Sequence, residues 1–148
     1  TGLCKPEHNA FQTGLEHRIA EAGLSERIVF LGEVPQAEIP LWHRRVSLCM
    51  APARNEGFGL TPLEAMASGS AVLASTAGAF SQLVREGETG HLVPIDDVEA
   101  LTDRLGQLLA DPERLREFGR RGRELAVAHH TIQGEAQAIE AVYESLWT

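Results

Sequence analysis

The sequence has few of the features that mark membrane, secreted or disulfide-rich proteins. Its two cysteines, Cys4 and Cys49, show no framework spacing, so a reducing compartment fits best. No apolar run approaches the roughly 20 residues that span a bilayer. No signal-peptide pattern is present either. We therefore expect a cytoplasmic location, with the inner face of the membrane as a peripheral alternative for a larger protein.

Patterns typical of nucleic-acid binding, ATP hydrolysis and metal binding are also missing. The chain has 13 Lys and Arg against 21 Asp and Glu, a formal net charge of −8, and no dense basic stripe, so we expect no nucleic-acid partner. There is no Gly-x-x-x-x-Gly-Lys-Ser/Thr motif. His129 and His130 have no partners at ligand spacing, so we expect no metal. An anion must then be held locally, by backbone amides and a few arginines.

Short apolar runs alternate with helical patterns along the 148 residues, of which 43% are hydrophobic. The predicted strands are 27–31, 46–51, 71–75 and 92–94. The predicted helices are 7–22, 35–45, 61–68, 79–85, 97–110, 112–128 and 132–147, with Gly23 ending the first and Pro112 opening the sixth. This alternation predicts an α/β domain: a Rossmann-like parallel sheet with helices on both faces.

The beginning of the sequence departs from that pattern. A doubly wound domain usually opens with a strand, whereas this chain opens with a polar loop and a helix. We therefore expect residues 1–148 to be a partial domain, cut at its N-terminus from a larger protein. We also expect an exposed apolar patch where the absent parts would pack, and hence self-association.

The most informative stretch is 52–69, which follows a predicted buried strand and opens a helix. In a parallel α/β sheet this junction lies at the carboxyl ends of the strands, where ligands bind. Gly57 and Gly59 let a ligand approach the backbone closely. Free amides at the start of a helix, next to its positive dipole end, suit a phosphate or diphosphate.

A purely structural interpretation of the same stretch stays open. Glycines are common in strand-to-helix turns without any ligand. The run Thr61-Pro62-Leu63-Glu64 matches a capping box, with Thr61 as N-cap, Pro62 as the first helical residue and Glu64 reaching back. From the residues alone, Glu64 is as well explained by this helix cap as by a ligand.

Two carboxylates, Glu56 and Glu64, flank the loop with seven residues between them. A carboxylate only accepts hydrogen bonds, so each can hold two adjacent hydroxyls of a hexose or a ribose. One on each side of an amide cluster fits a sugar–diphosphate–ribose ligand. The rival chemistry is a glycosidase pair, but a glycosidase needs no anion site.

Glu56 to Glu64 resembles the E-x7-E motif of retaining GT-B glycosyltransferases of family 4. The similarity extends to the segments 27–34, 64–75 and 87–93 and covers about residues 13–147. Within that family, the run from Arg54 to Glu64 is most similar to lipopolysaccharide-core mannosyltransferases. The resemblance implies the donor-binding C-terminal half of a GT-B fold.

The resemblance also implies a role for each matching residue. Glu56 would hold the donor sugar as the catalytic carboxylate, and Glu64 would hold the ribose hydroxyls. The amides of Gly57, Phe58 and Gly59 would line the sugar pocket, and the backbone of Leu60 and Thr61 would face the diphosphate. Gly32, Glu33 and Val34 would border the base. The family's Arg/Lys pair and its acceptor-binding N-terminal domain would precede Thr1.

Three functions remain as hypotheses. The first is retaining transfer of a hexose, namely mannose from GDP-mannose, to a glycan or lipid-linked acceptor. This transfer would need no metal or cofactor, and we expect this chain alone to be inactive. The second is a binding module that holds a nucleotide sugar and transfers nothing. The third is an epimerase or phosphorylase on the same fold.

Overall fold

The computed structural model describes residues 6–147, and Cys4 lies outside them. The chain forms two packing units that divide after Pro35. Among its described residues, 6–35, the first contains one helix, α1 (Pro6–Glu21). Gly23 ends it as predicted, at φ +67°, with its N–H donating to the Ala20 carbonyl at 3.0 Å.

The apolar run 27–31, also in the first unit, is not the strand that the sequence predicted. Ile28, Val29, Phe30 and Leu31 have exposed fractions of 41 to 77%. A strand needs a neighbour that takes up its backbone N–H and C=O groups. No backbone pairing of these residues with another strand occurs within residues 6–147, so the run is extended but irregular.

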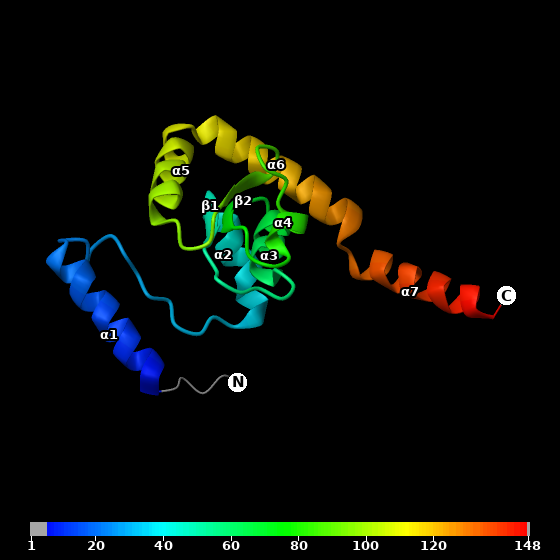
Figure 1. Cartoon of the computed structure of the whole chain (residues 1–148), viewed down its shortest axis with the longest axis horizontal. Coiled ribbons are helices and arrows are strands. Elements are labelled where there is room, and N and C mark those ends of the chain that lie inside the picture. The colour runs from blue at the N-terminus through cyan, green and yellow to red at the C-terminus, as the bar shows by residue number, and fades with distance from the viewer. Residues whose placement is uncertain (1–5, 148) are drawn as a thin grey trace. The chain divides into compact units, whose positions relative to one another are not determined.

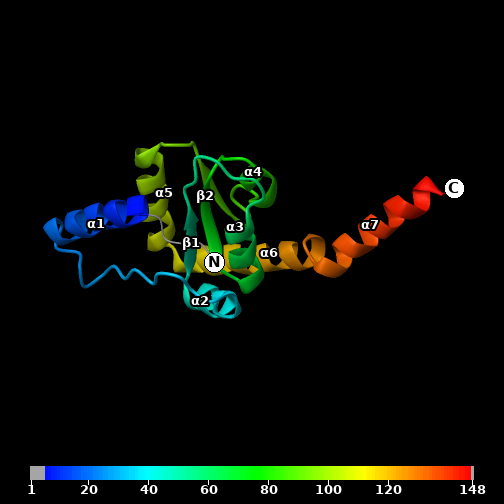
Figure 2. The ribbon, with the colours of Figure 1, turned by 90° about the horizontal axis from the view of Figure 1, so that it is seen from below.

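The second unit contains the remaining elements (Figures 1 and 2). In chain order they are η1 (Gln36–Glu38), α2 (Ile39–Arg45), β1 (Leu48–Ala51), α3 (Leu60–Ser68), β2 (Ala71–Ser75), α4 (Phe80–Leu83), β3 (Gly90–Val93), α5 (Val98–Ala110), α6 (Pro112–His129) and α7 (Ile132–Leu146). These elements match the predicted ones in type and order. Pro112 is the first residue of α6, as predicted.

The three strands form one parallel sheet with β2 in the centre. Leu48 pairs with Ala71 across β1 and β2, and Val72 pairs with Gly90 across β2 and β3. All five residues of β2 are buried. Because the strands are parallel, their carboxyl ends and the loops that follow them lie along one edge of the sheet.

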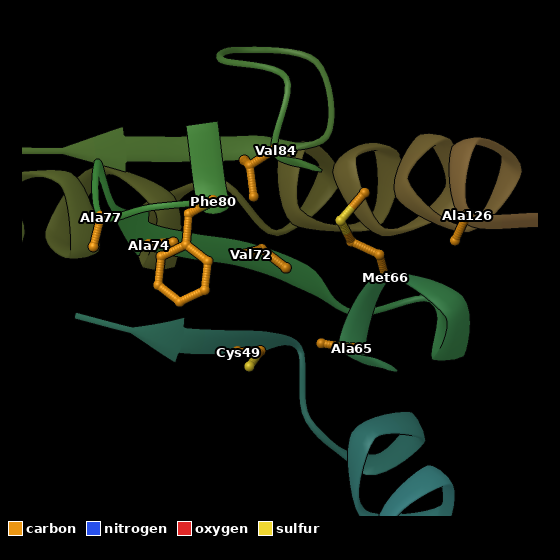
Figure 3. Close-up of a cluster of buried hydrophobic side chains, with 9 residues drawn as sticks. All are labelled: Cys49, Ala65, Met66, Val72, Ala74, Ala77, Phe80, Val84 and Ala126. Carbon is orange, nitrogen blue, oxygen red and sulfur yellow. The ribbon is translucent and has the colours of Figure 1, made fainter. Parts of the chain in front are cut away.

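Helices cover both faces of this sheet, which confirms the predicted fold class. On one face, Val72 and Ala74 of β2 pack with Cys49 of β1, Met66 of α3 and Phe80 of α4 (Figure 3). On the other face, Ala71 and Leu73 pack with Val93 of β3, Leu108 of α5 and Leu115 and Phe118 of α6. The alternation along β2 is the two-residue period of a strand. Burial also raises the pKa of the Cys49 thiol.

Glycines let α6 approach α3 and β2 closely. A Cβ placed on Gly119 would lie 2.1 Å from the Gly69 carbonyl oxygen, and one on Gly122 would lie 3.3 Å from the Met66 side chain. Gly69 itself ends α3 at φ +89°, a conformation that favours glycine. α3, the helix that carries Glu64, therefore packs closely against α6.

α7 has an exposed apolar surface. Ile139, Tyr143 and Leu146 have exposed fractions of 52, 62 and 73%, and Trp147 after the helix reaches 87%. Within residues 6–147 no helix is both long and apolar enough to cross a membrane. Self-association of the chain remains a prediction.

Candidate functional site

The loop between β1 and α3, residues 52–59, is called the glycine loop below. It leaves β1 at Ala51 and enters α3 at Leu60, so it lies at the carboxyl edge of the parallel sheet, where the sequence placed it. This edge is where ligands bind in open α/β sheets, because the helices that follow the strands point their N-termini toward it.

The start of α3 differs from the predicted capping box. The N-cap is Gly59 at φ +88°, and no side chain caps the helix within the part of the chain that the structure describes. Leu60 is the first helical residue, so Thr61 is the second and Pro62 the third. Pro62 has no N–H to be capped, and the left-handed turn at Gly59 starts the helix two residues earlier than predicted. The capping-box role of Thr61, Pro62 and Glu64 was therefore wrong.

The Glu56 side chain forms hydrogen bonds within the glycine loop. Its Oε1 accepts hydrogen bonds from the N–H of Phe58 at 3.2 Å and of Gly59 at 3.0 Å. Its side chain is half-buried. The sequence placed Glu56 and the amides of Gly57, Phe58 and Gly59 around one ligand but did not predict that Glu56 would bind the amides itself. The contact shows that the amides of Phe58 and Gly59 converge on one carboxylate oxygen.

The next two amides remain available. The N–H groups of Leu60 and Thr61 lie in the first turn of α3, where no helical carbonyl precedes them, and neither has an acceptor among residues 6–147. The side chains of Phe58 and Leu60 are exposed, at 62 and 58%. Four successive amides thus lie at the entry to α3: Glu56 binds the first two, and the next two have no acceptor among residues 6–147.

Glu64 lies on the second turn of α3 and is half-buried. Its Oε1 accepts a hydrogen bond from Gln36 Nε2 of η1 at 3.2 Å. Nothing in the sequence pointed to Gln36, which lies 28 positions before Glu64. The two residues come together only because α2, which follows η1, packs beside α3. Glu64 is therefore an oriented carboxylate with capacity for further donors.

The expected base-binding residues belong to the other packing unit. Gly32 has φ +65°, Glu33 is exposed and Val34 is half-buried. Their role at the base therefore remains a prediction.

Two contacts fix the first half of the glycine loop, and neither was predicted. Ser75 Oγ, at the end of β2, donates to the Ala53 carbonyl. Arg54 Nε donates to Asp96 Oδ1 at 2.7 Å, which joins the glycine loop to the loop after β3. The hydrogen bond to Asp96 raises the pKa of Arg54. Pro52, Ser75, Asp96 and Asp97 also line a cavity of about 230 Å³ at this edge.

No group of three or more His, Cys, Asp or Glu side chains within residues 6–147 is placed to hold a metal ion. His129 is the last residue of α6 and His130 follows it. The expectation that the protein needs no metal or cofactor remains a prediction.

The sequence and the fold have clear relatives. The family model "Glycosyl transferases group 1" matches residues 9–125. The chain is 49% identical over 146 residues to the lipopolysaccharide core biosynthesis mannosyltransferase LpcC of Rhizobium leguminosarum bv. viciae, covering 99% of this chain and 41% of that protein. It is 35% identical over 120 residues to the GDP-mannose-dependent alpha-(1-6)-phosphatidylinositol monomannoside mannosyltransferase of Mycolicibacterium smegmatis. This match covers 76% of this chain and 31% of that protein.

Among solved structures, the C-terminal domain of a group 1 glycosyl transferase (LpcC) from Francisella tularensis superimposes with a TM-score of 0.80 at 33% identity. The match covers 86% of this chain and 66% of that one. The chain spans less than half the length of the two curated relatives.

Proposed function

Because the chain belongs to the group 1 glycosyltransferases, we propose that it is the donor-binding domain of a retaining, family 4 enzyme that transfers mannose from GDP-mannose. The observation that carries this proposal is the amide cluster at the start of α3, where Phe58 and Gly59 already bind a carboxylate oxygen. The mannosyltransferase names of the two relatives support mannose, and one of those names includes GDP-mannose.

The diphosphate of the donor would bind at the free amides of Leu60 and Thr61. These amides lie at the positive end of the α3 dipole, which attracts anions. The chain carries a net charge of −8, so a local cluster of donors must overcome a repulsive overall field. Backbone donors suit a leaving group that gains negative charge, because they are already oriented when the charge develops.

Glu56 would exchange partners when the donor binds. A hexose hydroxyl accepts the hydrogen bonds of Phe58 and Gly59 through its oxygen and donates its own proton to the released Glu56 carboxylate. The Glu56 carboxylate and the amides of Phe58 and Gly59 would then all keep a hydrogen-bond partner. In the transfer step the sugar C1–O bond to the diphosphate breaks, and the diphosphate departs with the electron pair. The acceptor hydroxyl attacks the same face of C1 and passes its proton to the departing phosphate.

Glu64 would hold the two ribose hydroxyls, with Gln36 fixing one of its oxygens. Gly32, Glu33 and Val34 would border the base. The acceptor, a glycan or lipopolysaccharide-core sugar, would bind mainly to parts of the relatives that this chain does not match. We propose a cytoplasmic protein that needs no metal and reaches a lipid-linked acceptor at the inner face of the membrane.

A binding module that holds a nucleotide sugar and transfers nothing is the alternative function. A transfer assay beside a GDP titration separates the two. The epimerase or phosphorylase hypothesis has no observation in its favour, and the identity of the sugar product would exclude it.

Calorimetric titration of this chain with GDP-mannose, GDP, UDP-glucose and UDP tests the proposal. We expect the guanine nucleotides to bind more tightly, and Glu56→Ala to weaken GDP-mannose more than GDP. Transfer should require the remaining length of the relatives, and NMR of the product should show a retained anomer. Failure to bind any nucleotide sugar would contradict donor binding, and an inverted anomer would contradict retention.

A further inference from the structure

Ser75 at the end of β2 and the segment that follows it, residues 76–83, contact the glycine loop at three points. Ser75 holds the Ala53 carbonyl at the start of the loop. Gly78 meets Glu56 in the middle, and Phe80 and Leu83 meet Gly59 at its end. The middle contact is the tightest, and no side chain takes part in it.

Gly78 touches the backbone of Glu56 itself. A Cβ placed on Gly78 would lie 1.8 Å from the Glu56 carbonyl oxygen, 2.9 Å from its carbonyl carbon and 3.5 Å from its Cα. Gly78 also has φ +49°, a left-handed conformation that favours glycine. Both the space and the backbone therefore require a residue without a side chain.

The segment around Gly78 is held by a hydrogen bond to β3 and by buried side chains. Thr76, next to β2, donates its N–H to the Val93 carbonyl of β3 at 2.9 Å. Ala77 and Phe80, on either side of Gly78, have exposed fractions of 2 and 1%. Both belong to the core cluster that contains Val72 and Ala74 of β2 (Figure 3). A packed core shifts little when one neighbour is crowded. A side chain at position 78 would therefore displace the glycine loop rather than the segment beneath it.

We propose that Gly78 is a positioning residue for Glu56: it lets the Glu56 carbonyl rest on the segment after β2, so that the Glu56 carboxylate and the amides of Phe58 and Gly59 converge on one oxygen. This inference rests on the proposed function only where it concerns the sugar. Cβ atoms essentially never come within 3.0 Å of such an oxygen. Gly78→Ala must therefore move Glu56 by about 1 Å. A misplacement of this size lowers the reaction rate about 100-fold in comparable catalytic sites.

The test compares Gly78→Ala with Gly87→Ala. Gly87 has φ +72°, and nothing lies within 4 Å of a Cβ placed on it, so Gly87→Ala reproduces the backbone strain without the collision. The first measurement needs no ligand. Amide NMR shifts and hydrogen exchange of residues 56–59 are recorded for the wild-type chain and both variants. We expect Gly78→Ala to move the signals of Phe58 and Gly59 and to speed their exchange at least tenfold, and Gly87→Ala to leave both unchanged.

The second measurement is the ratio of the GDP and GDP-mannose dissociation constants, which isolates the sugar's share of affinity. We expect Gly78→Ala to bring this ratio close to one while GDP affinity changes less than threefold, and Gly87→Ala to keep the wild-type ratio. Ser75→Ala loosens the same loop without crowding it and should lower the ratio by a smaller factor.

The two measurements separate the two ideas. Unmoved Phe58 and Gly59 signals in a folded Gly78→Ala chain would overturn the positioning role, whatever the ligand data. If Gly78→Ala does not fold, unchanged loop exchange in Ser75→Ala would overturn it instead. Moved signals in a wild-type chain that binds no nucleotide sugar would support the positioning role and contradict the proposed function.

Discussion

Replacing Glu64 by Gln separates a ribose-binding carboxylate from a merely structural one. In the structure Glu64 caps nothing on α3, since the N-cap is Gly59. Its recorded hydrogen bond comes from Gln36 Nε2 at 3.2 Å. The amide introduced by Glu64→Gln would keep an oxygen that accepts this bond, so folding should be almost unaffected. Changes at such positions usually stay within about 0.5 kcal/mol, which corresponds to a melting-temperature shift of about 2 °C.

The effect on nucleotide binding should be larger. Hydrogen bonds to a charged group contribute about 1.5–3 kcal/mol, against about 1 kcal/mol for neutral ones. Losing the charge from bonds to the ribose hydroxyls should weaken GDP binding by about two- to thirtyfold. We would measure the GDP affinity by calorimetry and the melting temperature, each for the wild-type chain and for Glu64→Gln. Glu140→Gln, on the exposed α7, is the matched control and should change neither.

A modified ligand assigns the loss to the ribose. If Glu64 holds the diol, 2′-deoxy-GDP should bind the wild-type chain more weakly than GDP does, and this preference should shrink in Glu64→Gln. Equal binding of the two nucleotides by the wild-type chain would refute the reasoning, as would an unchanged preference in the variant. A large drop in melting temperature with intact GDP affinity would return Glu64 to a structural role.

Other contacts lead to four further predictions. Glu56→Ala should lower turnover by about 100- to 1,000-fold in a transfer assay and barely change melting temperature; unchanged turnover would remove Glu56 from the site. Gln36→Ala frees one Glu64 oxygen and should weaken GDP binding less than Glu64→Gln does; calorimetry checks the order. Gly119→Ala should lower the free energy of unfolding by about 1–3 kcal/mol, because its Cβ would collide with the Gly69 carbonyl; a denaturant titration showing stabilisation would refute this. Arg120 and Arg121 lower the pKa of Glu117 to about 2 from 4.5, so this stabilisation is present above pH 4.5 and is lost as pH falls toward 2; melting curves of Glu117→Gln should show a weaker pH dependence there.

Local patterns were enough to predict the layered fold. The apolar run of β2 and the helical periods around it predicted a strand in a parallel sheet covered on both faces, and the alternate residues of β2 do pack on two helical layers. The run 27–31 shows the limit of such patterns. Its composition is that of a strand, but strand formation depends on a partner that the run itself does not specify.

The glycine loop was located correctly, but its internal contacts were not predicted. Sequence spacing placed Glu56 and Glu64 on either side of an amide cluster. It also left a capping box at Thr61 open, because it cannot show that Gly59 adopts a left-handed turn and starts α3 early. Gly78 and Gln36 were missed because each acts on a residue more than 20 positions away.

The burial of β2 has a consequence for refolding. Between Glu64 and Arg85 the chain carries no charged residue, and this stretch contains the whole of β2. In the native fold, helices on both faces cover that strand. When the chain is diluted from denaturant, the same stretch is a bare β-prone segment without the charged residues that oppose intermolecular pairing. Recovery of native protein should therefore decline steeply as protein concentration rises, even where the folded chain is stable.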